Sequence, residues 1–210
     1  MTPIIANIVD QARLRANALP QITSNPLRIC VWILILVGVA ARLSPFIDLD
    51  ERLFWQYITE DGYLLQTVAR NMAIGLGMST AEGTIPTNGV QPLATFLFSA
   101  LHFISGGSKK GGIALVTLFS VLMSAGAGYY AYKVASRIFA CLRHGRELAM
   151  VSAALWFAAP HTITHSMNGL ETGIYFFAIL FTLNYYLAAV SDDSRPFSSM
   201  QRLVLGLLMG

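Results

Sequence analysis

Residues 92–104 read PLATFLFSALHFI, and the interpretation of this apolar stretch decides how the chain crosses a membrane. With about 13 residues, it is shorter than the ~17–25 residues that a membrane-spanning helix needs. The stretch is therefore either a short span or a helix that is re-entrant or lies in the membrane interface. The charges that follow it distinguish these alternatives.

The next apolar run, residues 111–132, is long enough to cross a membrane. It is followed by the densest basic cluster of the chain, Lys133, Arg137, Arg143, His144 and Arg146. If 92–104 were a span, alternation would put this cluster outside, whereas the positive-inside rule favours the cytoplasm. We therefore expect 92–104 to be a helix at the outer surface, although Lys109 and Lys110 then also lie outside.

The composition of the whole chain is typical of a membrane protein. Of its 210 residues, 55% are hydrophobic and 12% are charged, and the formal net charge is +3. Soluble domains carry about 25% charged residues, so this chain has too little polar surface for a water-facing globule. The basic excess is expected on the cytoplasmic flanks of spans. The composition therefore predicts an all-α, polytopic transmembrane helix bundle and argues against nucleic-acid binding.

The remaining apolar runs complete the predicted topology. Residues 1–26 are expected to form a cytoplasmic interfacial segment, with a frayed tail as the alternative, and residues 27–210 one transmembrane domain. Spans are predicted at about residues 27–43, 111–132, 148–164 and 172–190, with a further apolar run from residue 203 onward. Because that last run is too short to cross, we expect the chain to be the N-terminal part of a longer protein. Arg42, near the outer end of the first span, is expected to reach the lipid headgroups.

Residues 44–110 form the first outer loop in this topology. The basic residues Arg13, Arg15 and Arg28 precede the first span, and acidic residues predominate in the loop, so the N-terminus is predicted to be cytoplasmic. Inside the loop, apolar residues recur at helical spacing at Leu65, Val68, Met72 and Leu76. This pattern predicts an amphipathic juxtamembrane helix over about 62–75, lying on the membrane and ended by Gly75 or Gly77.

Acidic residues at the outer surface are the main candidates for chemistry. Carboxylates close to hydrocarbon are costly and tend to mark a function or a water-lined cavity. Glu60 and Asp61 begin the amphipathic helix, and the competing explanation is that Asp61 merely caps it. Glu171 follows Asn168 by three residues, a spacing that equally fits a capping box for the next span.

Two pairs of basic residues have both a possible functional role and a purely structural explanation. His161 and His165 have the spacing of zinc ligands, but no glutamate lies between them and Pro160 disrupts the turn, so water-satisfied interfacial histidines are the alternative. Lys109 and Lys110, between glycines, would hold a phosphate as point charges or form a solvated turn. No metal site is predicted from these residues.

Several motifs, taken in order, resemble a known family. The first outer loop contains EDGYLLQTVARNMAIGLGMS at 60–79 and TNGVQPLATFLFSALHFISGG at 87–107. YYAYKVASRIF follows at 129–139 and NGLETGIYFF at 168–177. Over about residues 28–190 the chain resembles the N-terminal half of the GT-C superfamily of integral membrane glycosyltransferases, and within it the polyprenyl-phosphate-sugar-dependent mannosyl- and arabinofuranosyltransferases.

The resemblance implies roles for particular residues. Glu60 and Asp61 match the acidic pair that supplies the catalytic base, and Glu171 matches an acidic residue of the second outer loop that faces it. Arg70-Asn71 and Gly75-Leu76-Gly77 match the helix and turn that shape the first loop, and Gln91-Pro92-Leu93 the start of its juxtamembrane helix. The chain departs from the family in having Glu-Asp for Asp-Asp, Gly62 for the usual Ala, and Asn88-Gly89-Val90-Gln91 where Thr-Ser is common. These departures leave the sugar and the acceptor open.

The expected function is transfer of a sugar, with inversion, from a polyprenyl-phosphate-linked donor to an acceptor hydroxyl of a glycan, lipid or protein. The reaction is expected at the outer face of a membrane, the prokaryotic plasma membrane rather than the endoplasmic reticulum, with Asp61 as base and Glu60 and Glu171 assisting. Candidate substrate-binding residues are Arg70, Asn71, Asn88, Gln91, Lys109, Lys110 and His165. No cofactor is required, although a divalent metal would be compatible, and the expected partners include membrane lipids but no nucleic acid. The 210 residues alone are expected to be inactive; the alternatives are a transporter or flippase of lipid-linked sugars, or a structural membrane subunit.

Overall fold

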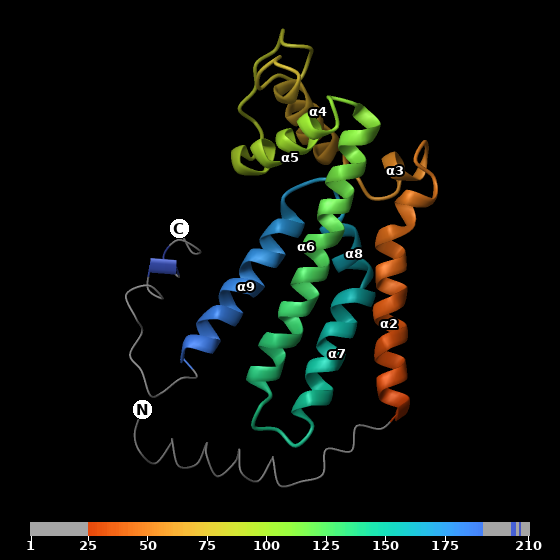
Figure 1. The fold of residues 1–210 in the computed structure, drawn as a ribbon, viewed down its shortest axis with the longest axis vertical. Coiled ribbons are helices and arrows are strands. Elements are labelled where there is room, and N and C mark those ends of the chain that lie inside the picture. The colour runs from red at the N-terminus through yellow and green to blue at the C-terminus, as the bar shows by residue number, and fades with distance from the viewer. Residues whose placement is uncertain (1–24, 191–202, 205, 207–210) are drawn as a thin grey trace. The chain divides into compact units, whose positions relative to one another are not determined.

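The computed structural model describes residues 25–190 together with residues 203, 204 and 206. The described residues form helices and no strand, so the prediction of an all-α fold is confirmed (Figure 1). In chain order the elements are α2 (Asn25–Leu43), the 3₁₀ helix η1 (Ser44–Ile47), α3 (Arg52–Trp55), α4 (Glu60–Ala73), α5 (Pro92–Ile104), α6 (Lys109–Ile138), α7 (Gly145–Ala158), α8 (Pro160–Ser166) and α9 (Thr172–Val190). The predicted interfacial segment 1–26 lies outside the described residues except for its last two, and so does most of the run from residue 203.

Three of the described helical segments are long and apolar enough to cross a membrane, namely Pro26–Ile47, Lys109–Ile138 and Thr172–Val190. The chain is therefore that of a membrane protein. The third predicted span, 148–164, instead holds parts of two helices, α7 (Gly145–Ala158) and α8 (Pro160–Ser166). Pro160 has no backbone N–H and restricts the residue before it to an extended conformation, and Ala159 is extended, with φ −66° and ψ 123°.

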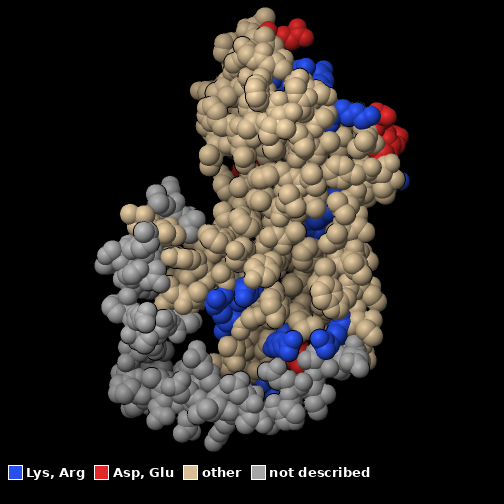
Figure 2. Space-filling model, viewed as in Figure 1, with Lys and Arg blue, Asp and Glu red and all other residues tan. Residues whose placement is uncertain are grey.

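The described chain divides into two compact units. Unit 1 comprises residues up to 37, 127–158 and those from 178 on, and unit 2 comprises residues 38–126 and 159–177. In unit 1, α6 packs on α9 through Tyr130 and Phe181, whose ring centroids lie 5.2 Å apart in an edge-to-face arrangement. On the face shown in Figure 2, basic side chains predominate on unit 1, whereas acidic and basic side chains lie near one another on unit 2.

The core of unit 2 lies between α4 and α5. Leu65 and Val68 of α4, at most 1% exposed, pack with Ala94 and Phe98 of α5. Leu65 and Val68 of the predicted apolar stripe are therefore covered by α5, and the prediction that these two side chains face the membrane is wrong. Burial against a neighbouring helix removes the same apolar area from water that the membrane would have removed.

Helix α5 spans residues 92–104, the range over which a helix was predicted. Pro92 fits the first helical position, where no N–H is needed, and Gly106 and Gly107, with φ of +67° and +74°, follow the helix end. On the side of α5 away from its core face, Leu93, Phe96, Phe103 and Ile104 are between 58% and 81% exposed. One helix thus carries two apolar faces, of which only one is covered within unit 2.

Arg42 of α2 is buried rather than directed to the headgroups, and the prediction for it is wrong. Its side chain is 1% exposed, and its Nε donates to Ser124 Oγ at 2.8 Å while Nη1 donates to the Gly38 carbonyl at 3.0 Å. A buried charge needs such partners. One of them, Ser124, is on α6, and no motif or spacing in the sequence links it to Arg42.

Candidate functional site

The N-terminus of α4 presents two adjacent carboxylates. Thr59 caps the helix, because its Oγ1 accepts a hydrogen bond from the Gly62 N–H at 3.2 Å. The interpretation of Asp61 as the cap is therefore wrong, and the side chains of Glu60 and Asp61 are exposed in the first turn. The helix dipole stabilises negative charge at this end.

The segment of residues 168–171, between α8 and α9, packs directly on this helix end. The Thr59 N–H donates to the Asn168 carbonyl at 3.1 Å. A Cβ placed on Gly62 would lie 2.2 Å from that same carbonyl oxygen, so only glycine permits the contact. The acidic pair and the segment that bears Glu171, which are more than 100 residues apart in sequence, are thus brought together in unit 2.

Glu171 does not form the predicted capping box. Asn168 Oδ1 accepts from the Leu170 N–H at 3.1 Å, and α9 starts at Thr172, so Glu171 lies just before the helix and not at its third position. Glu171 Oε2 is buried and has no hydrogen-bond partner among the described residues. A buried carboxylate oxygen without a donor is costly, and it is a natural acceptor for a hydroxyl.

Gln66 and His102 link this segment to α5. Gln66 Nε2 donates to the Gly169 carbonyl at 2.8 Å, and Gln66 Oε1 lies 3.1 Å from His102 Nε2. Burial, together with the positive charge of Arg70, lowers the pKa of His102 from its usual 6.5 to about 4. His102 is therefore neutral at pH 7, with Nε2 as the donor to Gln66, and its Nδ1 has no partner within the described chain.

Two pockets adjoin α4, and Tyr63 lines both. The first, here called the acidic pocket, has a volume of about 570 Å³ and is lined by Trp55, Ile58, Thr59, Glu60, Asp61 and Tyr63. The phenol of Tyr63 donates to the Phe54 carbonyl, and burial raises the pKa of this phenol. Tyr63 is thus a fixed, protonated wall between the two pockets.

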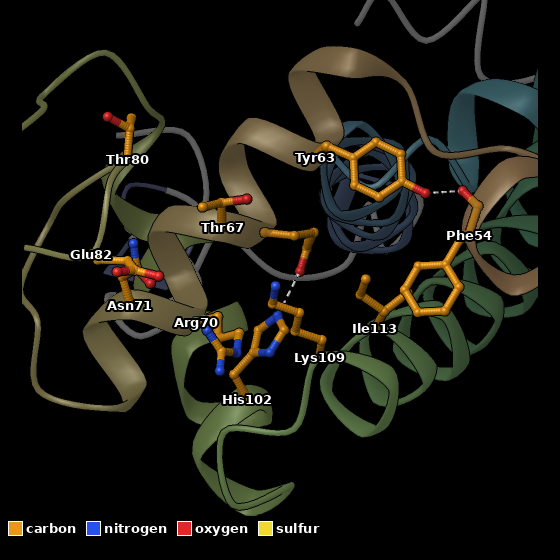
Figure 3. Close-up of a pocket in the computed structure, with 11 residues that line it drawn as sticks. Phe54, Tyr63, Thr67, Arg70, Asn71, Thr80, Glu82, His102, Lys109 and Ile113 are labelled. Carbon is orange, nitrogen blue, oxygen red and sulfur yellow. Dashed lines mark hydrogen bonds between the residues drawn. The ribbon is translucent and has the colours of Figure 1, made fainter. Parts of the chain in front are cut away.

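The second, here called the basic pocket, has a volume of about 380 Å³ (Figure 3). It is lined by Phe54, Tyr63, Gln66, Thr67, Arg70, Asn71, Thr80, Glu82, His102, Lys109 and Ile113. Arg70 Nε donates to the Gly107 carbonyl at 2.7 Å, which orients the guanidinium, and its two terminal nitrogens have no partner among the described residues. Lys109 likewise forms no ion pair with a described residue. The pocket therefore presents two available cations and a polar wall.

The loop after α4 forms one wall of the basic pocket. Asn71 Nδ2 donates to the Ser79 carbonyl at 2.7 Å, and Ser79 Oγ accepts from the N–H groups of Ala81 and Gly83 at 3.3 and 2.9 Å. Asn71 thus acts mainly as a support for this loop. Glu82, at the pocket wall, has a φ of +48° and is the one non-glycine residue of the described chain with a positive φ.

The other candidate residues lie outside both pockets. Lys110 pairs with Asp50 at 2.6 Å, so only Lys109 of the lysine pair lines the basic pocket. Asn88 and Gln91 are exposed, and the Gln91 carbonyl accepts from the Thr95 N–H at the start of α5. His165 is exposed on α8, with its ring stacked on that of His161 at 6.1 Å between centroids. Across the described residues, no group of three or more His, Cys, Asp or Glu could hold a metal ion.

Several residues of the site were not among the sequence candidates, among them Gln66, His102 and Glu82. Gln66 stands on the helical stripe of Tyr63, Thr67 and Arg70, and that spacing alone could have placed it beside them. The hydrogen-bond partner of His102 lies on another helix, and Glu82 reaches the basic pocket only because the loop after α4 folds back onto that helix. Neither arrangement can be predicted from the residues next to them in sequence.

The comparisons with known proteins found no relative of this chain. It matches no protein-family model, no curated protein and no solved structure. Any assignment of function therefore depends on the chemistry of the site.

Proposed function

We propose that this protein is a membrane glycosyltransferase that moves a sugar from a polyprenyl-phosphate-linked donor to an acceptor hydroxyl at the outer membrane face, with inversion. The observation that carries the proposal is the pairing along α4 of a carboxylate pocket and a cation pocket. Acid groups suit activation of a hydroxyl, and cations suit the phosphate that leaves.

The acidic pocket would hold the acceptor. An alcohol is a weak nucleophile, and a positioned carboxylate that takes its proton typically contributes about 10²–10⁴-fold to the rate. We assign this role to Asp61, with Glu60 beside it. Glu171, whose Oε2 is buried and has no hydrogen-bond partner in the part of the chain that the structure describes, would accept a hydrogen bond from an acceptor or donor hydroxyl and so orient it.

The basic pocket would hold the donor phosphate. Arg70 and Lys109 would stabilise the charge that develops on the leaving polyprenyl phosphate. At 1.5 Å per residue, the Cα atoms of Asp61 and Arg70 lie about 13 Å apart along α4. At 3.6 residues per turn the two side chains leave α4 on opposite sides, so the acceptor and the donor phosphate would meet beside Tyr63, which lines both pockets.

The proposed sidedness follows from the charges. The basic cluster after α6 would be cytoplasmic, together with the N-terminus, and α4, α5 and the 168–171 segment would be outside. A prokaryotic plasma membrane is the proposed location. The acceptor remains a glycan, lipid or protein, and a divalent metal is compatible with the chemistry.

A flippase or transporter of lipid-linked sugars is the rival function. Transporters bind substrate near the bilayer midplane between broken helices. The break at Ala159 fits that description, whereas the carboxylates at the start of α4 and the cations of the basic pocket lie outside the three candidate spans or at the very start of one, which favours surface chemistry. A structural subunit would leave the two pockets without a role.

The test is Asp61→Asn in the full-length protein, assayed for release of polyprenyl phosphate from its lipid-linked sugar donor. Loss of about 10²–10⁴-fold in kcat is expected. Asp50→Asn is the matched control, because Asp50 is an exposed acid of the same loop that lines neither pocket, and it should retain activity. Near-normal release by Asp61→Asn would remove Asp61 from the base role, and movement of the donor across the bilayer without release would establish the flippase.

A further inference from the structure

We propose that Glu82 sets the charge selectivity of the basic pocket, so that it accepts a phosphodiester headgroup with one negative charge and disfavours a diphosphate. This inference rests on the proposed function, because it takes the basic pocket as the site of the donor phosphate. It adds a residue that discriminates between classes of lipid-linked donor.

Hydrogen bonds within the loop after α4 fix the backbone position of Glu82. Ser79, 2% exposed, is held to α4 by Asn71, and its hydroxyl accepts from the N–H groups on either side of Glu82. Backbone bonds from Thr80 N to Ile85 O and from Thr87 N to Met78 O close the loop at 3.2 and 2.9 Å. The backbone that carries Glu82 is therefore held at the pocket by a short chain of contacts that starts on α4.

Glu82 occupies a backbone conformation that suits glycine better. A positive φ is uncommon for a residue with a side chain, because its Cβ then crowds the neighbouring backbone. The neighbouring Gly83, with φ +83°, has the conformation that glycine adopts freely. Glu82 thus lines the pocket although its backbone conformation is unfavourable for a residue with a side chain. Its carboxylate forms no hydrogen bond or ion pair with any described residue.

The charges of the pocket add up to a small positive value. Arg70 and Lys109 contribute two positive charges and Glu82 one negative charge, while His102 is neutral at pH 7 (Figure 3). A phosphodiester, with one negative charge, balances this pocket. A diphosphate would bring extra negative charge against Glu82, and such a repulsive contact is a common means of rejecting a competing ligand.

The test measures binding of three probes that share a farnesyl chain: farnesyl methyl phosphate, farnesyl phosphate and farnesyl diphosphate. The full-length protein is held in octaethylene glycol dodecyl ether, which contains neither sugar nor phosphate, and affinities are measured by calorimetry at low salt. Wild type is expected to prefer the methyl diester to the diphosphate. Glu82→Gln should shift this preference about three- to fivefold toward the diphosphate, the size of one exposed charge contact, and added salt should reduce the shift.

Three variants separate charge from other effects. Glu51→Gln removes an exposed charge of the same unit outside both pockets and should leave the preference unchanged. Glu82→Gly should show the same shift as Glu82→Gln while unfolding at an equal or higher temperature, because glycine accommodates the positive φ. Arg70→Ala should weaken all three probes.

Each outcome decides a separate point. If Glu82→Gln leaves the probe preference unchanged while Arg70→Ala weakens binding, Glu82 has no selective role and the phosphate pocket stands. If wild type binds no probe, or Arg70→Ala has no effect, the phosphate pocket and this inference both fail. The last probe is short-chain phosphatidylglycerol, an ordinary phospholipid diester. If it binds as tightly as farnesyl methyl phosphate, the pocket is a site for membrane lipid headgroups and not for the donor.

Discussion

At the scale of single residues, Gly62 is the point on which the site depends most. Its Cα lies so close to the Asn168 carbonyl that any Cβ would overlap the oxygen, at 2.2 Å. Gly62→Ala is expected to destabilise the protein by about 1–3 kcal/mol, as overpacking typically does, and to detach the 168–171 segment from α4.

The free energy of unfolding, measured by denaturant titration of the protein in detergent, tests this effect. Gly89→Ala is the matched control, because a Cβ at Gly89 meets only Thr87 Oγ1 at an ordinary 3.5 Å. Equal stability of the two variants would show that the Asn168 contact does not restrict position 62.

His102 predicts a pH dependence of stability. Its pKa is about 4 in the folded protein and about 6.5 in an unfolded chain, so the unfolded state binds more protons between these values and stability rises with pH. The stabilisation is complete above about pH 6.5 and is lost as the pH falls toward 4, by up to about 3 kcal/mol.

The measurement compares the free energy of unfolding of wild type and His102→Gln from pH 4 to pH 7. The difference between the two should change with pH over this window, because the carboxylates common to both proteins cancel. Parallel curves would mean that His102 titrates alike in the folded and unfolded states.

Residue roles were only partly predictable from the sequence. The sequence identified Arg70, Lys109 and the acidic pair, since their charges and helical spacing are local features. It left open whether Asp61 caps the helix, and did not consider Thr59, which does so, because both residue types suit that position. It could not identify Glu82 as a pocket residue, since that placement requires Ser79 to bind back to Asn71.

At the scale of elements, two phenylalanines of α5 test whether this helix packs on α4. Phe98 is fully buried against α4, whereas Phe103 on the opposite side is 71% exposed. Phe98→Ala is expected to cost about 3–5 kcal/mol of stability, and Phe103→Ala less than about 1 kcal/mol. Both variants remove the same side chain from one helix, so denaturant unfolding in detergent compares burial alone. Similar losses would contradict the packing of α5 on α4.

Apolar periodicity predicted where a helix lies and which face is apolar, but not what packs against that face. The pattern at Leu65 and Val68 marks a helix with one apolar face, and α4 has that face. Whether the membrane or α5 covers it depends on a segment 25 or more residues away, which periodicity does not specify. Similarly, the apolar content of 148–164 predicted one span, whereas the backbone restriction at Pro160 divides it into α7 and α8.

At the scale of the whole molecule, the all-α membrane protein was predictable because long apolar runs are a property of composition. The function requires more, namely that carboxylates and cations from distant segments share one surface. Within unit 2 the contacts of Thr59 with Asn168 and of Gln66 with Gly169 bring those segments together. The side of the membrane on which they lie is the central claim of the proposed function.

The most direct test is labelling of single cysteines in intact cells with a membrane-impermeant maleimide, after all native cysteines are replaced by serine. Glu60→Cys and His165→Cys place reporters beside the acidic pair and in the helix before the 168–171 segment, and Arg143→Cys reports on the basic cluster. All three positions are exposed. We expect labelling of positions 60 and 165 from outside, with position 143 labelled only after permeabilisation. Labelling of positions 60 and 165 only from the cytoplasmic side would contradict sugar transfer at the outer face.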